Sequence, residues 1–285
     1  MLTLVVALVG FLGMGVAGAI TAYASVAVLA ALATGVELAR AVREESGPQP
    51  AIGLSQVLGY GFQIYPASVT GYFSYRSDVL ILSAMLGDAA AIGLYTFAVS
   101  LAELTFFVPD SVSTVFYPRV ASMERDAADA LAPQVARFTV LITTLSVLLL
   151  IPAAFLAVIV ILPDFFGSIV PFLVLMPGIV ALSISKVLAG YIGGLGLPLS
   201  VAGASGANLV INIVANLLLI PPLGIAGAAL ASLISYSVHA ALLVLIAARL
   251  SRRPALGYVI PTAAEISRLA DGLRELRGRM ARRGA

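Results

Sequence analysis

Residues 15–26 read GVAGAITAYASV, and 209 positions later residues 224–235 read GIAGAALASLIS. Glycine occupies the first and fourth positions of both stretches, and alanine occupies the third, fifth and eighth. A leading glycine allows a tight reversal of the chain, and small residues let neighbouring helices approach closely. The two stretches therefore predict two equivalent helix starts, and the interval between them has room for six helices of membrane-spanning length.

The composition indicates that these helices lie in a membrane. Hydrophobic residues make up 61% of the 285 residues and charged residues only 11%, whereas about a quarter of the residues in a soluble domain are charged. Apolar runs of about 20 residues, enough to cross a bilayer as a helix, recur along the chain. We predict an all-α, polytopic helical membrane protein. The lack of cysteine excludes disulfides and thiolate sites.

Apolar length and Pro/Gly punctuation divide the chain into eight hydrophobic segments: 1–13, 17–40, 53–86, 89–119, 134–162, 167–191, 199–221 and 224–250. The first offers only about 20 Å of helix against a hydrocarbon core of about 30 Å, so it cannot span alone. Its repeat counterpart is the second half of a full span. We predict the last one to two helices of one lobe at 1–45, a complete six-helix lobe at 46–250 and a tail at 251–285. The helices before them are expected to be missing or supplied by another polypeptide.

The arginines predict the orientation of the segments. The connections around 13–15, 87–90, 163–167 and 221–224 contain no lysine or arginine. Basic connections remain cytoplasmic, so we place the arginine-bearing ones, and the C-terminus, on the cytoplasmic side of the cell membrane. The arginines concerned are Arg40, Arg43, Arg119, Arg125, Arg137, Arg249, Arg252 and Arg253.

Two stretches resemble a known transporter family. They are YRSDVLILSAMLGDAAAIGLYTFAVSLAELTFFVPDSVSTVFYPRVA from Tyr75 and INIVANLLLIPPLGIAGAALASLIS from Ile211, and they look like polysaccharide (O-antigen type) flippases. That family shares a superfamily with the lipid II flippases and the multidrug and toxin extrusion antiporters. The resemblance covers about residues 1–250 and implies a two-lobed transporter, of which this chain has the C-terminal lobe and the end of the N-terminal one. It implies alternating access for a lipid-linked oligosaccharide substrate.

Polar residues deep in a membrane usually face a cavity or one another. Five of them fall on one face of the fourth segment, at spacings of 4, 3, 7 and 4: Thr96, Ser100, Glu103, Asp110 and Thr114. Pro109 removes a backbone donor and predicts a kink beside Asp110. The stripe predicts either the wall of a hydrated lumen or a seam between helices.

Arg76 and Asp78 form a second set of candidates. Two residues correspond to about 200° on a helix, so their side chains point nearly opposite ways and need different partners. Arg76 is expected to reach Glu103 on the next, antiparallel helix. The pair is either a contact for a lipid diphosphate, which suits a planar guanidinium, or a structural ion pair between helices.

Three further sets of polar residues complete the candidates. Asn212 and Asn216 continue a stripe with Ser205 and Asn208, which either binds substrate or joins helices by hydrogen bonds. Lys186 lines a cavity or, as we favour, snorkels to the nearer membrane surface. His239 could couple transport to protons, but we expect a packed histidine.

The tail is predicted to form a basic amphipathic helix over 262–283. Residues 249–285 contain nine arginines and three acids, a net charge of +6. Such a helix suits an anionic leaflet, with a coiled coil as the alternative, and we expect no nucleic-acid binding.

The function that follows is transport. Because the chain carries no P-loop, metal-ligand cluster or nucleophile motif, we expect no enzymatic activity, no metal and no cofactor. The resemblance implies a lipid-linked oligosaccharide or polysaccharide flippase. A small-molecule cation antiporter of the same superfamily would instead depend on Glu103 and Asp110. A membrane subunit or gene fragment that transports nothing is the third alternative.

Overall fold

The computed structural model describes residues 3, 6–11, 13–44, 54–263, 265 and 267, and in these ranges the regular structure is helical. Six stretches of the described chain are long and apolar enough to cross a membrane: Gly15–Glu37, Ala89–Ser122, Arg125–Val160, Pro163–Gly194, Pro198–Leu223 and Ile225–Ser251. The prediction of an all-α, polytopic membrane protein is therefore confirmed. Helix α3 (Leu54–Leu86) is 33 residues long but is not among the six. Its sequence includes Arg76 and Asp78 together with several serines and tyrosines.

The chain divides into two compact units, Met1–Leu54 and Ser55–Ala285. The first unit contains a π-helical stretch, η1 (Val6–Phe11), and the long helix α2 (Gly15–Glu44). Gly15 has a positive φ of 55° and begins α2. Three residues later, a Cβ on Gly18 would lie 3.0 Å from the carbonyl oxygen of Leu8. The absence of a side chain at Gly18 thus lets η1 pack on the start of α2.

The second copy of the repeat has the same local structure. Helix α8 (Pro198–Leu223) ends at Gly224, whose φ is 56°, and α9 (Ile225–Ser251) begins at the next residue. A Cβ on Gly227 would overlap the carbonyl group of Leu219 in α8. Both copies therefore start a helix beside a left-handed glycine and press their second glycine against the preceding segment, as the sequence repeat predicts.

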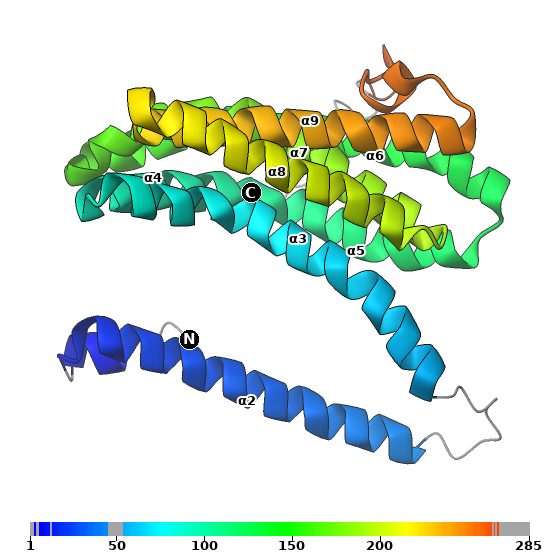
Figure 1. The fold of residues 1–285 in the computed structure, drawn as a ribbon, viewed down its shortest axis with the longest axis horizontal. Coiled ribbons are helices and arrows are strands. Elements are labelled where there is room, and N and C mark those ends of the chain that lie inside the picture. Colours follow the sequence, from blue (N-terminus) through cyan, green and yellow to red (C-terminus); the bar gives the residue numbers. More distant parts are fainter. Residues whose placement is uncertain are drawn as a thin grey trace, which may run out of the picture. The chain divides into compact units, whose positions relative to one another are not determined.

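Six helical passes make up the second unit (Figure 1). After α3, the second pass comprises α4 (Ala89–Glu103), the 3₁₀ turn η2 (Leu104–Phe106) and α5 (Phe107–Ser122). The third is α6 (Arg125–Val160), and the 3₁₀ stretch η3 (Pro163–Ser168) leads into α7 (Ile169–Gly194). Helices α8 and α9 complete the unit, and the 3₁₀ turn η4 (Ala255–Tyr258) follows them.

The break between α4 and α5 is where Pro109 predicts a kink. Pro109 has no N–H to donate, and its ring disfavours a regular turn around the carbonyl four residues earlier, at Thr105. Thr105 lies in η2. The Thr105 hydroxyl donates to the carbonyl of Ala102 at 2.7 Å. The kink therefore separates Glu103, at the end of α4, from Asp110, in the first turn of α5.

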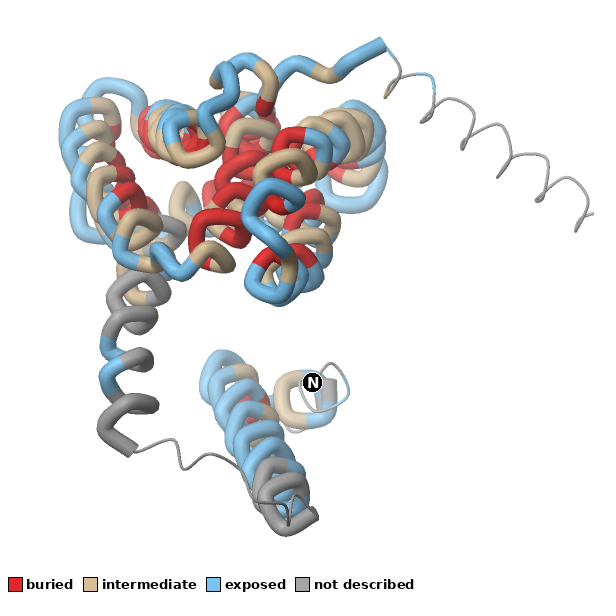
Figure 2. The backbone as a smooth tube through the Cα atoms, turned by 90° about the vertical axis from the view of Figure 1, so that its right-hand side faces the viewer, coloured by how far each residue is buried: buried red, intermediate tan, exposed pale blue. Residues whose placement is uncertain are grey.

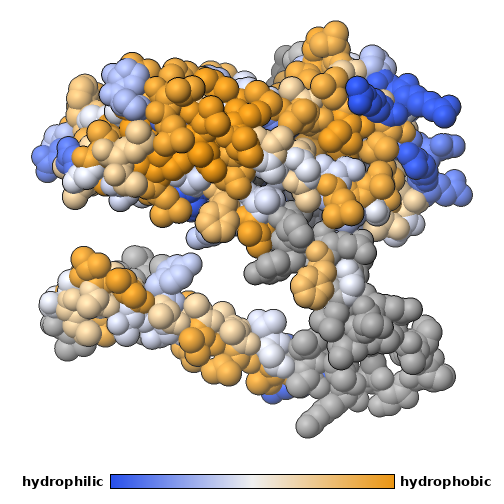
Figure 3. Space-filling model, viewed as in Figure 1, coloured by the Kyte–Doolittle hydropathy of each residue, from blue (hydrophilic) through white to orange (hydrophobic). Residues whose placement is uncertain are grey.

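The connections that contain arginine and those that contain no lysine or arginine lie at opposite ends of this bundle. Arg125, at the start of α6, donates to the carbonyl of Leu250 near the end of α9 at 3.3 Å. Near the other end, the rings of Phe97 and Phe165 have centroids 4.5 Å apart. Figure 3 shows a broad apolar surface, with strongly hydrophilic side chains gathered at the end where α9 finishes. We call this the arginine end of the bundle.

Helix α7 is at the centre of the core, where it contacts α4, α5, α6, α8 and α9. Buried residues run along α7 and α9, and Figure 2 shows buried stretches of the backbone gathered inside the second unit. Close packing depends on glycines of α7. A Cβ on Gly178 would lie 3.0 Å from the Cα of Leu233, and one on Gly190 would lie 3.0 Å from the Ser113 hydroxyl. The helices that carry the polar residues therefore pack closely around α7.

Candidate functional site

Arg76 and Asp78 point into different environments, as their spacing on α3 predicts. The Arg76 side chain is 43% exposed and pairs with Glu103 at 3.4 Å. Asp78 is only 1% exposed and lies between helices. The predicted Arg76–Glu103 pair is therefore confirmed as a contact, and Asp78 has a separate set of partners.

A second ion pair joins α5 to α7 near the kink. Lys186 Nζ lies 2.5 Å from Asp110 Oδ1 and 4.2 Å from the centre of the Phe106 ring. The Asp110 side chain is 56% exposed, while Lys186 is 16% exposed. The expectation that Lys186 snorkels is wrong, because its ammonium group is held by a carboxylate and an aromatic face. We call Arg76, Glu103, Asp110 and Lys186 the ionic face.

The hydroxyl groups of the predicted stripe accompany the ionic face without linking helices. Thr96, Ser100 and Thr114 each donate to the carbonyl four residues earlier in their own helix, at 2.8 Å. Ser100 and Thr114 are exposed, as is Asp110. The outward side of α4 and α5 therefore carries polar atoms on both sides of the kink.

Asp78 belongs to a group of buried polar residues that joins four helices. Its carboxylate accepts hydrogen bonds from the Tyr95 hydroxyl at 2.5 Å, the Ser232 hydroxyl at 3.2 Å and the Val79 N–H at 2.8 Å. Tyr95 is on α4 and Ser232 is on α9. A buried carboxylate with three donors is fully engaged within the protein.

The same group extends to α8 through Asn212. The Ser77 hydroxyl donates to Asn212 Oδ1 at 2.8 Å, and Asn212 Nδ2 donates to the Ser235 hydroxyl at 3.0 Å. Asn216 Nδ2 donates to Asn212 Oδ1 at 2.9 Å, and Ser235 donates to the carbonyl of Ser232 at 3.1 Å. We call Ser77, Asp78, Tyr95, Asn212, Asn216, Ser232 and Ser235 the buried network. Asn212 and Asn216 are fully buried, which matches the interhelical interpretation; contact with a substrate would require α8 and α9 to separate.

One turn further along, α8 and α9 each carry another buried polar side chain. Asn208 and His239 are buried, and in the described part of the chain neither side chain has a hydrogen-bond partner. His239 is thus a packed histidine, as expected. Ser205 is also buried, at the next position of the α8 stripe.

The arginine end has a charge pair that the sequence interpretation missed. Arg137 on α6 donates to Glu265 through Nε at 2.8 Å and through Nη2 at 2.7 Å, and also to the carbonyl of Gly257. Glu265 accepts from the Thr262 N–H at 2.8 Å, so Thr262 and Glu265 form a capping box, whose T-x-x-E pattern is legible in the sequence. The Arg137 guanidinium lowers the pKa of Glu265 to about 2. Most of the predicted amphipathic helix over 262–283 lies outside the described residues.

The missed members of the buried network also left a signal in the sequence. Ser232 and Ser235 are three residues apart on α9, and Asn212 and Asn216 are four residues apart on α8, so each pair lies on one face of its helix. Two antiparallel helices joined by a tight turn bring such stripes together.

Neither family models nor curated proteins nor solved structures match this chain.

Proposed function

We propose that this protein is part of a membrane transporter that moves an anionic lipid-linked saccharide across the cell membrane. The observation that carries the proposal is the ionic face. Four charged side chains lie within α3, α4, α5 and α7, and two of them, Arg76 and Asp110, are 43% and 56% exposed. Charged groups at membrane depth are strongly unfavourable against lipid. The ionic face therefore favours a hydrated path with a second wall outside Ser55–Ala285.

The chemistry of the ionic face suits a substrate with phosphate groups. Arg76 can give two parallel hydrogen bonds to phosphate oxygens, and Lys186 can add a point charge. Each cation is now paired with a carboxylate, at 3.4 Å and 2.5 Å. An arriving diphosphate can replace Glu103 and Asp110 as the partner of these cations. The family resemblance of Tyr75–Ala121 and Ile211–Ser235 supports a lipid-linked oligosaccharide as the substrate.

The orientation belongs to the same proposal. We place the arginine end, and with it the end of α9, on the cytoplasmic side, because basic connections remain there. Alternating access would then close and open the path between the arginine end and the opposite end, whose connections contain no lysine or arginine. The 3₁₀ turn η2 interrupts the second pass, and Gly224, with a φ of 56°, separates α8 from α9, so we propose these two breaks as hinges.

Complementation tests the proposal. The chain is expressed in a strain that lacks a polysaccharide flippase, both alone and with the polypeptide encoded immediately upstream, and surface glycan is measured. We expect at least one of the two forms to restore surface glycan. In that form, Arg76→Ala and Lys186→Ala should each abolish the restoration. Arg249→Gln is the matched control, because Arg249 is exposed at the arginine end away from the ionic face.

The antiporter alternative makes the opposite prediction for the charges. A cationic substrate needs Glu103 and Asp110, and it tolerates the loss of Arg76. Normal glycan export by Arg76→Ala would remove Arg76 as a phosphate ligand. Drug resistance that depends on Glu103 in the same strain would replace the flippase proposal by the antiporter.

A further inference from the structure

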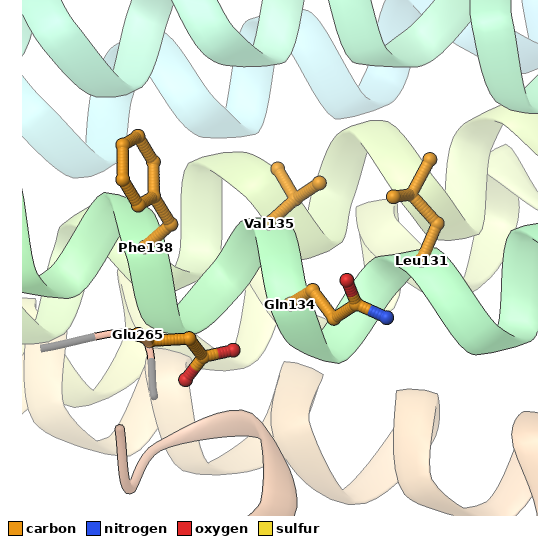
Figure 4. Close-up of a pocket in the computed structure, with 5 residues that line it drawn as sticks. All are labelled: Leu131, Gln134, Val135, Phe138 and Glu265. Carbon is orange, nitrogen blue, oxygen red and sulfur yellow. The ribbon is translucent and has the colours of Figure 1, made fainter. Parts of the chain in front are cut away.

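Two shallow apolar hollows flank the outward ridge of α6 near the arginine end. The larger, about 420 Å³, lies towards α5 and is lined by Ser111, Val112, Val115, Phe116, Arg119, Leu131 and Val135. The smaller, about 290 Å³, is lined by Leu131, Gln134, Val135, Phe138 and Glu265. Leu131 and Val135 line both, so the two hollows adjoin along one ridge. Figure 4 shows Leu131, Val135 and Phe138 on one side of α6, with Gln134 and Glu265 on the other.

The dimensions suit lipid chains. On α5 the larger hollow extends from Arg119, in the last turn, to Ser111, two turns deeper. Eight residues of helix correspond to about 12 Å, which is most of one leaflet of a hydrocarbon core about 30 Å thick. Val115 and Phe138 remain exposed within the hollows. In a membrane, such side chains are covered by acyl chains.

The charged residues around the hollows indicate which headgroup charge a bound lipid would have. Arg137 and Arg125 at the same end are paired, with Glu265 at 2.7 Å and with Asp129 at 3.9 Å. Arg119 is exposed, and among the residues that the structure describes no carboxylate pairs with its guanidinium. Glu265, the acid in the smaller hollow, is already neutralised by Arg137. The net uncompensated charge at the hollows is therefore positive and is located at Arg119.

We infer that one anionic diacyl phospholipid binds here, with its two chains on either side of Leu131 and Val135 and its phosphate on Arg119. An arginine near the membrane surface attracts an anionic headgroup. This attraction should make the protein retain an anionic lipid about fivefold better than a zwitterionic one. The site is separate from the ionic face, since none of Arg76, Glu103, Asp110 and Lys186 lines either hollow. Its occupation would cover the junction of α5 and α6, where few other contacts join the two helices.

Native mass spectrometry of the purified chain tests the inference. The protein in detergent is titrated with phosphatidylglycerol and, separately, with phosphatidylcholine of the same acyl chains. We expect wild-type protein to retain phosphatidylglycerol about fivefold better than phosphatidylcholine. Arg119→Gln should remove that preference and leave phosphatidylcholine binding unchanged, whereas Arg249→Gln should keep it.

A second variant tests the chains independently of the charge. Val135 lines both hollows, so Val135→Trp should fill them and lower the retention of both lipids. Equal binding of the two lipids by wild-type protein, or an undiminished preference in Arg119→Gln, would overturn the inference. Displacement of phosphatidylglycerol by millimolar inorganic phosphate would also overturn it, because the site would then read phosphate and not a membrane lipid.

Discussion

Arg76 and Asp78 are two residues apart on α3, yet Arg76 belongs to the ionic face and Asp78 to the buried network. The pairs of the ionic face are partly exposed, and each side chain lies beside a residue of opposite charge. The buried network connects α3, α4, α8 and α9 through hydrogen bonds that leave Asp78 1% exposed. Exposed charges can exchange partners at small cost, whereas buried polar groups lose free energy whenever a partner is removed. In the function proposed above, the first region recognises the substrate, while the hydrogen bonds of the second stabilise the helix packing.

The largest effect is expected when Asp78 is changed to alanine. The substitution leaves the Tyr95 and Ser232 hydroxyls without their acceptor in a buried position. We expect a loss of about 3 kcal/mol or more in the free energy of unfolding, measured by thermal or denaturant unfolding in detergent. Asp78→Asn, which keeps an acceptor oxygen, should lose less. Equal stability of Asp78→Ala and wild type would show that the network does not hold the helices together.

The next prediction compares two asparagines on α8, one with side-chain hydrogen bonds and one without them in the described structure. Asn212→Leu removes hydrogen bonds to Ser77, Ser235 and Asn216 and should cost about 2 kcal/mol. Asn208 is buried one turn away with no partner for its amide in the described structure. Asn208→Leu should therefore be neutral or stabilising, because an unpaired amide is removed from an apolar seam. The same unfolding assay ranks the two, and a larger loss for Asn208→Leu would contradict this reading.

Helical geometry explains what the sequence could predict about these regions. The angle between Arg76 and Asp78 is fixed by their spacing, and the depth of Glu103 follows from its position in the segment, so both the divergence and the Arg76–Glu103 pair could be foreseen. The repeated spacing of glycine and alanine likewise predicted equivalent helix starts at Gly15 and Gly224, which both have a positive φ. Local periodicity is enough for each of these.

The other contacts depend on which helices become neighbours. Lys186 is 76 residues from Asp110, and Arg137 is 128 residues from Glu265. Neither separation indicates contact until α7 lies beside α5 and the segment after η4 folds back on α6. The stripe of Asn212 and Asn216 was equally compatible with a lumen and a seam, because polar spacing does not say whether a partner helix or water faces it. Only the packing of α8 on α9 distinguishes them.

Arg76→Gln should sharpen the comparison from its exposed side. The Arg76–Glu103 pair lies 3.4 Å apart, with both side chains partly exposed, so we expect a change of less than about 1 kcal/mol in the free energy of unfolding. Glycan export in the complementation assay should nevertheless fall about tenfold or more, because Arg76 is the proposed phosphate ligand. A stability loss as large as that of Asp78→Ala would place Arg76 with the structural residues.

The Arg137–Glu265 pair tests the comparison at an intermediate exposure and gives the smallest expected effect. Its side chains are 13% and 15% exposed, and the pair holds the segment after η4 against α6. The hydrogen bond from Arg137 lowers the pKa of Glu265 from an ordinary 4.5 to about 2. A lowered pKa means that the stabilisation is fully present above pH 4.5 and is lost as the pH falls towards 2.

A single label can follow that loss, because the chain has no cysteine. A fluorophore on Ala263→Cys should keep a constant mobility from neutral pH to about pH 4.5 and become more mobile below it, with the whole-protein stability changing by no more than about 1 kcal/mol. Glu265→Gln should show the mobile signal at every pH, since its amide cannot form the charged pair. If the label on the Glu265→Gln protein still responded to pH, another group would control the segment. If the label on the Glu265→Gln protein were as immobile as on wild type at neutral pH, the Arg137–Glu265 pair would contribute no more than an exposed ion pair. Burial alone would then not explain why the buried network is expected to stabilise the protein more than the ionic face.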